Sequence, residues 1–146
     1  MATLTDIADA VVAELNGHTF SQPFTAARMY RPLFDLKELS TLHVTVAPAG
    51  FTVEPIDRAR NQEEYVIDVA VQQAPDPLDN AHLDPLAGLV EEVAAFFRLR
   101  RPTTYSAAIC VKAALAPGSD RGFLVEHMDE MRLFTSILAL TFRVVR

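Results

Sequence analysis

The sequence predicts an α+β fold, in which a mainly antiparallel sheet of four to five strands has two helices packed on one face. Two segments repeat apolar residues at the spacing of an α-helix, and several others alternate apolar with polar residues as strands do. The expected order is helix, three strands, helix, two strands, and this scarcity of helices between strands favours antiparallel pairing. A chain of 146 residues corresponds to a single domain, expected to span residues 1–146.

The first helix is expected near the N-terminus. Its apolar residues recur at helical spacing, at Leu4, Ile7, Ala8, Val11, Val12 and Leu15. Thr3 or Thr5 can cap its start. The pair Asn16-Gly17 is expected to end it in a left-handed conformation.

The strands of the first half are separated by prolines and short turns. A first strand is predicted over residues 24–31 and a second over residues 42–47, where Pro48 closes it. Residues 51–56 fit a short strand, and residues 65–72 alternate as a longer one.

The second half is expected to contain one helix and two strands. Asp84 as the cap and Pro85 at the first helical position open the helix, whose apolar stripe runs to Phe97. A strand over residues 106–115 follows. The apolar run over residues 133–145 is rich in β-branched and aromatic residues and predicts a long last strand. The side chains expected on its core face are Leu138, Leu140 and Phe142.

Composition narrows the classes of function. The net charge is −6, and no basic cluster exceeds Arg98, Arg100 and Arg101, which disfavours a protein that grips nucleic acid phosphates. The single cysteine, Cys110, excludes an intramolecular disulfide. The apolar run over residues 133–142 is far shorter than the ~20 residues that span a bilayer, so no membrane partner is expected.

An acidic stretch precedes and includes the second predicted helix. Residues 74–97 hold five carboxylates and no lysine or arginine. His82 stands among Asp76, Asp79 and Asp84, but the spacing lacks the glycine and distal glutamate of a calcium loop, so we expect no metal there. Asp76, Asp79 and Asp84 are expected in an exposed loop that faces a partner or lines a lumen through which DNA slides. Solvation alone also explains them.

The other reactive side chains form no catalytic arrangement. Cys110 is flanked by apolar residues in a predicted strand, where a free cysteine is usually a small buried hydrophobe. The pairs Glu63-Glu64 and Glu91-Glu92 are adjacent, so their members point in different directions and are expected to be surface charge. The charges around His127 indicate a solvated turn or helix. The sequence thus predicts no catalytic residue, no metal, no cofactor and no enzyme activity.

Four segments of the chain together carry a resemblance. They are the helix over residues 7–15, the segment RMYRPLFDLKEL over residues 28–39, the link over residues 58–60 before the strand at 65–69, and the ending FTSILALTFR over residues 134–143. In the order of these segments, in size and in the general pattern of residues, the chain resembles small phage structural proteins. These are the minor tail proteins of tail-terminator or tail-completion type found in long-tailed phages and prophages.

The resemblance implies an assembly role. Such proteins are α+β and form a closed ring, usually of six subunits, on the end of the tail tube, where they stop its polymerisation and provide the surface for joining the head. The implied partners are other copies of the chain, the tail-tube protein and a head-tail connector protein, and DNA passes through without specific binding. The implied location is the virion tail, after assembly in the host cytoplasm. The family has no catalytic residues to carry over.

Two other classes stay open from the sequence. One is another phage connector, such as a neck or head-closure protein. The other is a small ligand-binding α+β domain. A ring of subunits needs heterologous surfaces that close after a fixed number of copies, whereas a ligand-binding domain needs a deep polar pocket.

Overall fold

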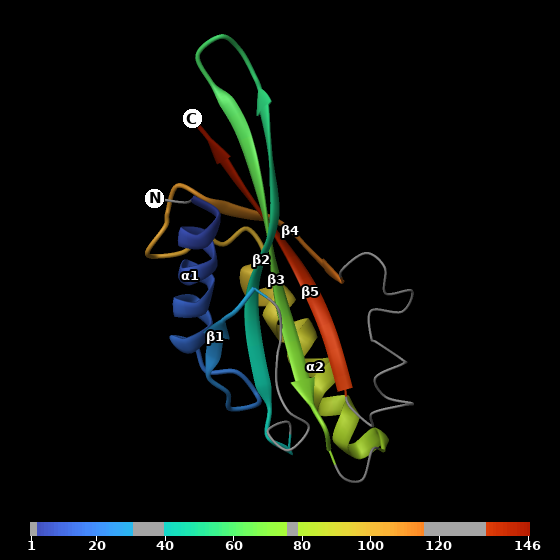
Figure 1. Ribbon diagram of the computed structural model, residues 1–146. Helices are drawn as coiled ribbons and strands as arrows, with labels where there is room; N and C mark the ends of the chain where they lie inside the picture. Colours follow the sequence, from blue (N-terminus) through green and yellow to red (C-terminus); the bar gives the residue numbers. More distant parts are fainter. Residues whose placement is uncertain (1–2, 31–39, 76–78, 116–133) are drawn as a thin grey trace.

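The computed structural model describes residues 3–30, 40–75, 79–115 and 134–146. Its elements in chain order are α1 (Thr3–Asn16), β1 (Ala26–Arg28), β2 (His43–Pro55), β3 (Asn61–Gln73), α2 (Asn80–Phe97), β4 (Ile109–Leu115) and β5 (Phe134–Val145). Two helices and a five-stranded sheet in the described ranges form an α+β fold, which confirms the predicted fold class (Figure 1).

The five strands form one mixed sheet in the order β1-β2-β3-β5-β4. β1 pairs with β2 in parallel, and the other three pairs are antiparallel. β5 therefore lies between β3 and β4 and is hydrogen-bonded on both sides. The prediction that the last apolar run is a strand with one face in the core is confirmed, because Leu138, Leu140 and Phe142 are all buried.

Both helices cover the same face of the sheet. α1 packs against β1, β2 and β3, and α2 packs against β4 and β5. The alternation of β3 places Ile67 and Val69 under the helices, and both are fully buried. The largest fully buried side chains are Phe97, Phe142, Ile7, Leu15, Ile67, Leu86, Leu89 and Leu140. Burial of each such side chain is worth about 1.5–3 kcal/mol, so this face supplies most of the hydrophobic stabilisation.

β2 is longer than the sequence predicts, because Pro48 does not end it. The two strands predicted over residues 42–47 and 51–56 are one strand with an irregularity between Pro48 and Gly50. Proline lacks a backbone N–H, yet strands tolerate it at bulges and open edges. Both conditions hold here, since β1 pairs with β2 only as far as Val46.

α2 begins earlier than predicted. Asp79, and not Asp84, is the N-cap, and its carboxylate accepts the backbone N–H of His82 at 3.1 Å. Pro85 lies inside the helix instead of at its first position. Its missing N–H leaves the carbonyl of Ala81 without a helical donor, which the helix tolerates because Ala81 is exposed to solvent.

α1 ends at Asn16 without the predicted left-handed residue. Neither Asn16 nor Gly17 has a positive φ angle. Instead the Asn16 side-chain amide accepts the backbone N–H of Ala26 at 2.8 Å and donates to the Ala26 carbonyl at 3.1 Å. A side chain thereby ties the end of the helix to β1, which replaces the local turn expected from the sequence.

Candidate functional site

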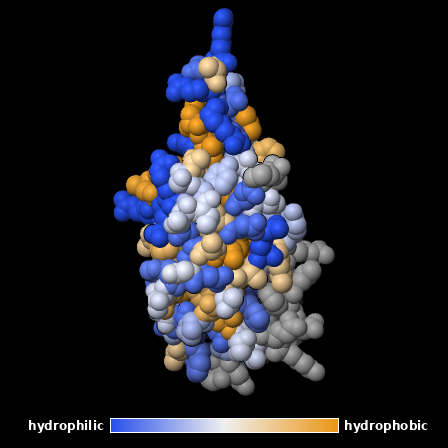
Figure 2. Space-filling model, turned by 90° about the vertical axis from the view of Figure 1, so that its left-hand side faces the viewer, coloured by the Kyte–Doolittle hydropathy of each residue, from blue (hydrophilic) through white to orange (hydrophobic). Residues whose placement is uncertain are grey.

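The hairpin of β2 and β3 projects beyond the helices and the rest of the sheet (Figure 1). We call residues 51–61 the arm, and every one of them is exposed. Phe51, Val53 and Ile56 are large apolar side chains on the arm, with 61%, 49% and 49% of their surface exposed. Figure 2 shows the molecule narrowing into this projection, with hydrophobic atoms among hydrophilic ones. Apolar side chains gathered on a projection are typical of a surface that contacts another molecule.

The tip of the arm is held by one carboxylate. Asp57 accepts the backbone N–H groups of Ala59 at 2.8 Å and of Arg60 at 2.9 Å. The guanidinium of Arg60 also donates to Asp57, at 2.9 Å and 3.1 Å. These hydrogen bonds, that of the Ala59 N–H above all, hold the pKa of Asp57 below its usual value. The tip thus has a defined turn although no other element covers it in the described part of the chain.

The base of the arm is joined to the C-terminal residue of the chain. Arg146 donates to the Glu63 carboxylate at 2.6 Å and 2.9 Å, and to the hydroxyl of Thr3 at 3.0 Å. Its backbone exchanges two hydrogen bonds with Asn61, at 2.7 Å and 3.0 Å. The bonds from Arg146, then from the Tyr65 hydroxyl, lower the pKa of Glu63. Glu63 therefore stays ionised at neutral pH and anchors the arm to the body.

A groove lies between the C-terminal end of α2 and the edge strand β4. Its volume is about 510 Å³, and it is lined by Ala94, Ala95, Arg98, Leu99, Cys110, Val111, Lys112 and Ala113. We call it the α2–β4 groove. Its charged side chains, Arg98 and Lys112, are both cationic, and neither has an ion-pair partner within the described residues. The groove thus combines an apolar lining with two unpaired positive charges.

Leu99, which lines this groove, has an unusual backbone conformation. Its φ angle is 54°, the only positive value among the described non-glycine residues. Two backbone hydrogen bonds at 3.0 Å hold it there, from the Leu99 N–H to the Cys110 carbonyl and from the Cys110 N–H to the Arg100 carbonyl. The side chain is 62% exposed. A left-handed backbone costs an ordinary residue about 1–2 kcal/mol, and the two hydrogen bonds offset part of this cost.

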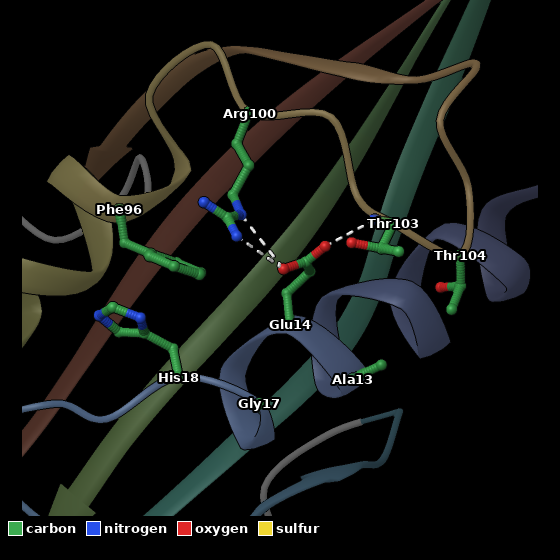
Figure 3. Close-up of a pocket in the computed structure, with 8 residues that line it drawn as sticks. All are labelled: Ala13, Glu14, Gly17, His18, Phe96, Arg100, Thr103 and Thr104. Atoms are coloured by element: carbon green, nitrogen blue, oxygen red, sulfur yellow. Dashed lines mark hydrogen bonds and ion pairs between the residues drawn. The ribbon is translucent and has the colours of Figure 1, made fainter.

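A second hollow, of about 390 Å³, separates α1 from the segment that follows α2 (Figure 3). Glu14 of α1 lies at its centre and accepts hydrogen bonds from Arg100, at 3.1 Å, and from the Thr103 N–H, at 2.6 Å. The guanidinium of Arg100 lies 4.0 Å from the ring centroid of Phe96. The ring of His18 packs against the same phenyl ring, with centroids 4.4 Å apart. We call this group the α1 clamp.

The α1 clamp joins α1 to the segment that follows α2 through Glu14. Burial alone would raise the pKa of Glu14, but the hydrogen bonds from Thr103 and Arg100 bring it below its ordinary value. The carboxylate is therefore ionised at neutral pH, and each of its oxygens already accepts a hydrogen bond.

The residues of the predicted acidic loop are separated by the structure. Asp76 lies outside the described residues. Asp79 is exposed and caps α2, where it also bonds the His82 ring at 2.6 Å. Asp84 is exposed on the first turns of α2, so residues 80–84 belong to a helix and not to a loop. Of the two described residues, only Asp79 has an ion-pair partner in the described ranges, and that partner is His82, three residues further along the chain.

The other reactive residues occupy structural positions. Cys110 is buried in β4, and burial raises the pKa of its thiol to about 11, so it is not a nucleophile at neutral pH. Glu63 and Glu64 point to opposite faces as predicted, but Glu63 is buried and not surface charge. Its partner is Arg146, whereas Glu64 accepts from Arg143 at 2.9 Å. The cluster around His127 lies outside the described residues.

The two residues of the pair Glu91-Glu92 have different surroundings. Glu91 is exposed, whereas Glu92 accepts the backbone N–H of Ser21 at 3.1 Å and also bonds its hydroxyl. The segment after α1 is thereby attached to α2. Within the described ranges, no three His, Cys, Asp or Glu side chains are grouped as metal ligands.

Sequence reasoning missed the arm, the α2–β4 groove and the α1 clamp. The arm had a partial signal, since two predicted strands flank the turn at residues 57–60. The clamp had none, because Glu14 and Arg100 are separated by 86 residues. Pairs so distant in sequence meet only through the packing of α1 and α2 on one face.

Two comparisons of this chain with known proteins found nothing similar. No protein-family model matches it, and a search of curated proteins finds no match. Among the described residues, no helix has the length and hydropathy needed to cross a membrane.

Proposed function

We propose that this chain is a phage or prophage structural protein that assembles as a ring on the end of the tail tube. In this role it ends tube polymerisation and provides the surface on which the head joins. Its partners are other copies of itself, six in the usual ring, the tail-tube protein and a head-tail connector protein. It works by binding and not by catalysis, in the virion tail, after assembly in the host cytoplasm.

One observation carries the proposal: three exposed large apolar side chains lie on a projecting arm, while three buried or half-buried carboxylates are used in internal pairs. Glu14, Glu63 and Glu64 each bind an arginine of the same chain. Carboxylates committed in this way support a scaffold better than an active site. The arm, in contrast, supplies contact surface without chemistry, which suits an assembly subunit. The four segments that resemble tail-terminator proteins point the same way.

The edges of the sheet also suit assembly. β1 at one edge is only three residues long, and β4 at the other edge pairs only with β5 among the described strands. An edge strand presents unpaired backbone N–H and C=O groups that a neighbouring subunit can satisfy. A ring subunit needs such surfaces on two sides, and this fold provides one at each end of the sheet.

The exposed carboxylates are assigned a role toward DNA. Asp79 and Asp84 are both exposed and face the lumen or a basic partner in this proposal, whereas Asp76 lies outside the described residues. Negative charge on a lumen wall repels phosphates, so DNA passes without binding. From this role we expect that charge reversal at Asp84 slows the passage of DNA and leaves folding unchanged.

The test mixes the protein with the tail-tube protein of the same genome and measures tube length by electron microscopy. We expect tubes of bounded length with additional density at their ends. Glu91→Gln, a change at an exposed position of α2, serves as the control and should act like the parent. Tubes that grow without limit and have bare ends would contradict the proposal. Binding to the head connector without any effect on tubes would instead support a neck or head-closure role.

A further inference from the structure

We propose that the α2–β4 groove binds an extended acidic segment of a partner protein, which adds to the sheet as a strand beside β4. This inference goes beyond the proposed function, because any partner that exposes such a segment can make the contact, in a tail or elsewhere. It rests on three observations: an edge strand whose outer side is open after its first residues, an apolar groove beside that edge, and an unpaired cation on each wall of the groove.

The outer side of β4 is open to another strand. At its start, Cys110 donates its N–H to the Arg100 carbonyl and accepts the Leu99 N–H, both at 3.0 Å, so the chain itself bonds this edge there. In the described ranges, residues 111–115 form no backbone–backbone hydrogen bond other than those with β5. An extended segment can continue the pairing that Leu99 and Arg100 begin. Such strand addition satisfies the outward N–H and C=O groups of an edge.

The groove beside this edge has room for the side chains of an added strand. Its volume of about 510 Å³ is within the range of about 300–1,000 Å³ that is common for ligand sites. Small or apolar side chains line both walls, Ala94 and Ala95 from α2, and Val111 and Ala113 from β4. Alternate side chains of a strand point to the same face, so one set on the added strand faces α2 and this apolar lining. Branched apolar side chains at alternate positions therefore fit the groove.

The charges of the groove select an anionic partner. Arg98 is on the α2 wall and Lys112 is on the β4 wall, and both are exposed. Neither has an ion-pair partner within the described residues, and the described residues that line the groove include no carboxylate. A carboxylate on the added strand can interact with both cations, which fixes the choice of partner more than it adds affinity.

The same features favour a peptide over a nucleic acid. A nucleic acid strand offers phosphates to Arg98 and Lys112, but it has neither apolar side chains for the groove nor a peptide backbone for the edge of β4. An acidic peptide strand uses the cations, the apolar lining and the edge together.

The first test uses a fluorescein-labelled peptide of alternating valine and aspartate, and fluorescence anisotropy measures its binding. We expect the parent protein to bind it at least about tenfold more tightly than a peptide of alternating valine and lysine. Arg98→Glu and Lys112→Glu should each weaken binding of the aspartate peptide about tenfold, and the double variant should prefer the lysine peptide. Arg58→Glu, at an exposed position of the arm, makes the same change in net charge and should bind like the parent. Equal binding of the two peptides by the parent would overturn the proposal.

The second test asks whether the peptide adds as a strand. An aspartate peptide with an N-methylated backbone keeps its charges and side chains but cannot donate hydrogen bonds to β4, so it should bind about tenfold more weakly. Amide hydrogen exchange of residues 111–115 should slow about tenfold when the unmethylated peptide binds, whereas exchange of residues 51–56 in the arm should not change. Equal binding of the methylated peptide, with no slowing in β4, would contradict strand addition.

Other occupants of the groove give different results. Displacement of the peptide by an equal concentration of a single-stranded DNA octamer would assign the groove to phosphates. A protein that sediments as a dimer and leaves the peptide unbound would assign it to a second copy. Either result would overturn the proposal.

Unchanged thermal unfolding of each variant shows that a loss of binding does not come from misfolding, and the comparison of peptides on the parent needs no variant. The outcome is also separable from the tube assay. Peptide binding without tube capping would keep the groove assignment and remove the tail role, and capping by a parent protein that binds no peptide would do the reverse.

Discussion

The body and the arm of this protein are made from the same two strands but obtain their order in different ways. In the body, β2 and β3 lie under the helices, and residues such as Val46 and Ile67 are fully buried. In the arm, the same strands continue without a covering layer among the described residues, and Phe51 and Val53 are largely exposed. The arm is ordered by backbone pairing, by the Asp57 turn and by the bond between Arg146 and Glu63.

Because of this difference, the residues that stabilise the fold are not the residues that the arm exposes for contact with other molecules. A strand that owes its order to pairing and turn bonds can present apolar side chains without the fold depending on them. The body can then be rigid while the arm supplies surface. Changes in the body should therefore unfold the protein, and changes in the arm should alter what it binds. Each of the following experiments either sharpens this division or breaks it.

The largest effect is expected from removal of β5. A chain that ends at Thr135 loses the strand between β3 and β4, including buried side chains worth about 1.5–3 kcal/mol each, which together rival a total stability of about 5–15 kcal/mol. It should show no cooperative thermal transition by circular dichroism. The matched change in the arm replaces residues 54–62 with an Asn-Gly turn, and should melt cooperatively within about 5 °C of the parent. A cooperative transition in the truncated chain would contradict the role of β5.

A single phenylalanine in each region gives the next largest contrast. Phe142→Ala empties a fully buried site and should cost about 3–5 kcal/mol of unfolding free energy. Phe51→Ala loses only partial contact with the Tyr65 ring, at a centroid distance of 5.8 Å, and should cost less than about 1 kcal/mol. Urea denaturation measures both. Similar losses from the two variants would show that the arm contributes to the core.

The α1 clamp should give an intermediate effect that depends on pH. Glu14→Gln removes a carboxylate that accepts hydrogen bonds from Arg100 and Thr103, and should cost about 1–3 kcal/mol at pH 7. The folded pKa of Glu14 is lowered, so its contribution is present above the unfolded value of about 4.3 and is lost as pH falls through the folded value. Denaturation at pH 7 and pH 3 should therefore show the difference from the parent shrinking in acid. Glu91→Gln should show little difference at either pH.

The smallest expected effect is a gain. Leu99→Gly relieves a positive φ angle at an exposed position, and should raise the unfolding free energy by roughly 0.5–1 kcal/mol after the added flexibility of the unfolded chain is subtracted. Leu99→Ala keeps the unfavourable backbone and should leave stability nearly unchanged. If the glycine variant is more stable yet associates less with itself, Leu99 is retained for contact. A loss of stability in the glycine variant would show that its side chain supports the body.

The sequence predicted the elements whose signals are local. The helical spacing of Ile7, Val11 and Leu15 and the alternation of Leu138, Leu140 and Phe142 identify α1 and β5, because one periodic face must be buried. Pro48 and Pro85 led to two wrong predictions, one for the end of a strand and one for the start of a helix. Proline is a strong local signal, but β2 accommodates it at an irregularity on an open edge and α2 accommodates it beside an exposed carbonyl.

The candidate site was largely outside the reach of the sequence. Glu63 looked like surface charge because its partner, Arg146, is 83 residues away and reaches it only when β3 and β5 pair. The strands of the arm were visible, but whether a helix covers them depends on the tertiary packing. The α2–β4 groove is lined in part by Leu99, and the residue type does not reveal that its φ angle is positive.

The burial of Cys110 makes local opening of the fold measurable by thiol labelling. A thiol reagent attacks the thiolate, so the native state is protected both by the high pKa of this thiol and by its lack of exposure. The rate of labelling then reports how often β4 and the end of α2 separate, as hydrogen exchange does for a backbone amide. Labelling of Cys110 thus measures local opening of the fold at a single native residue.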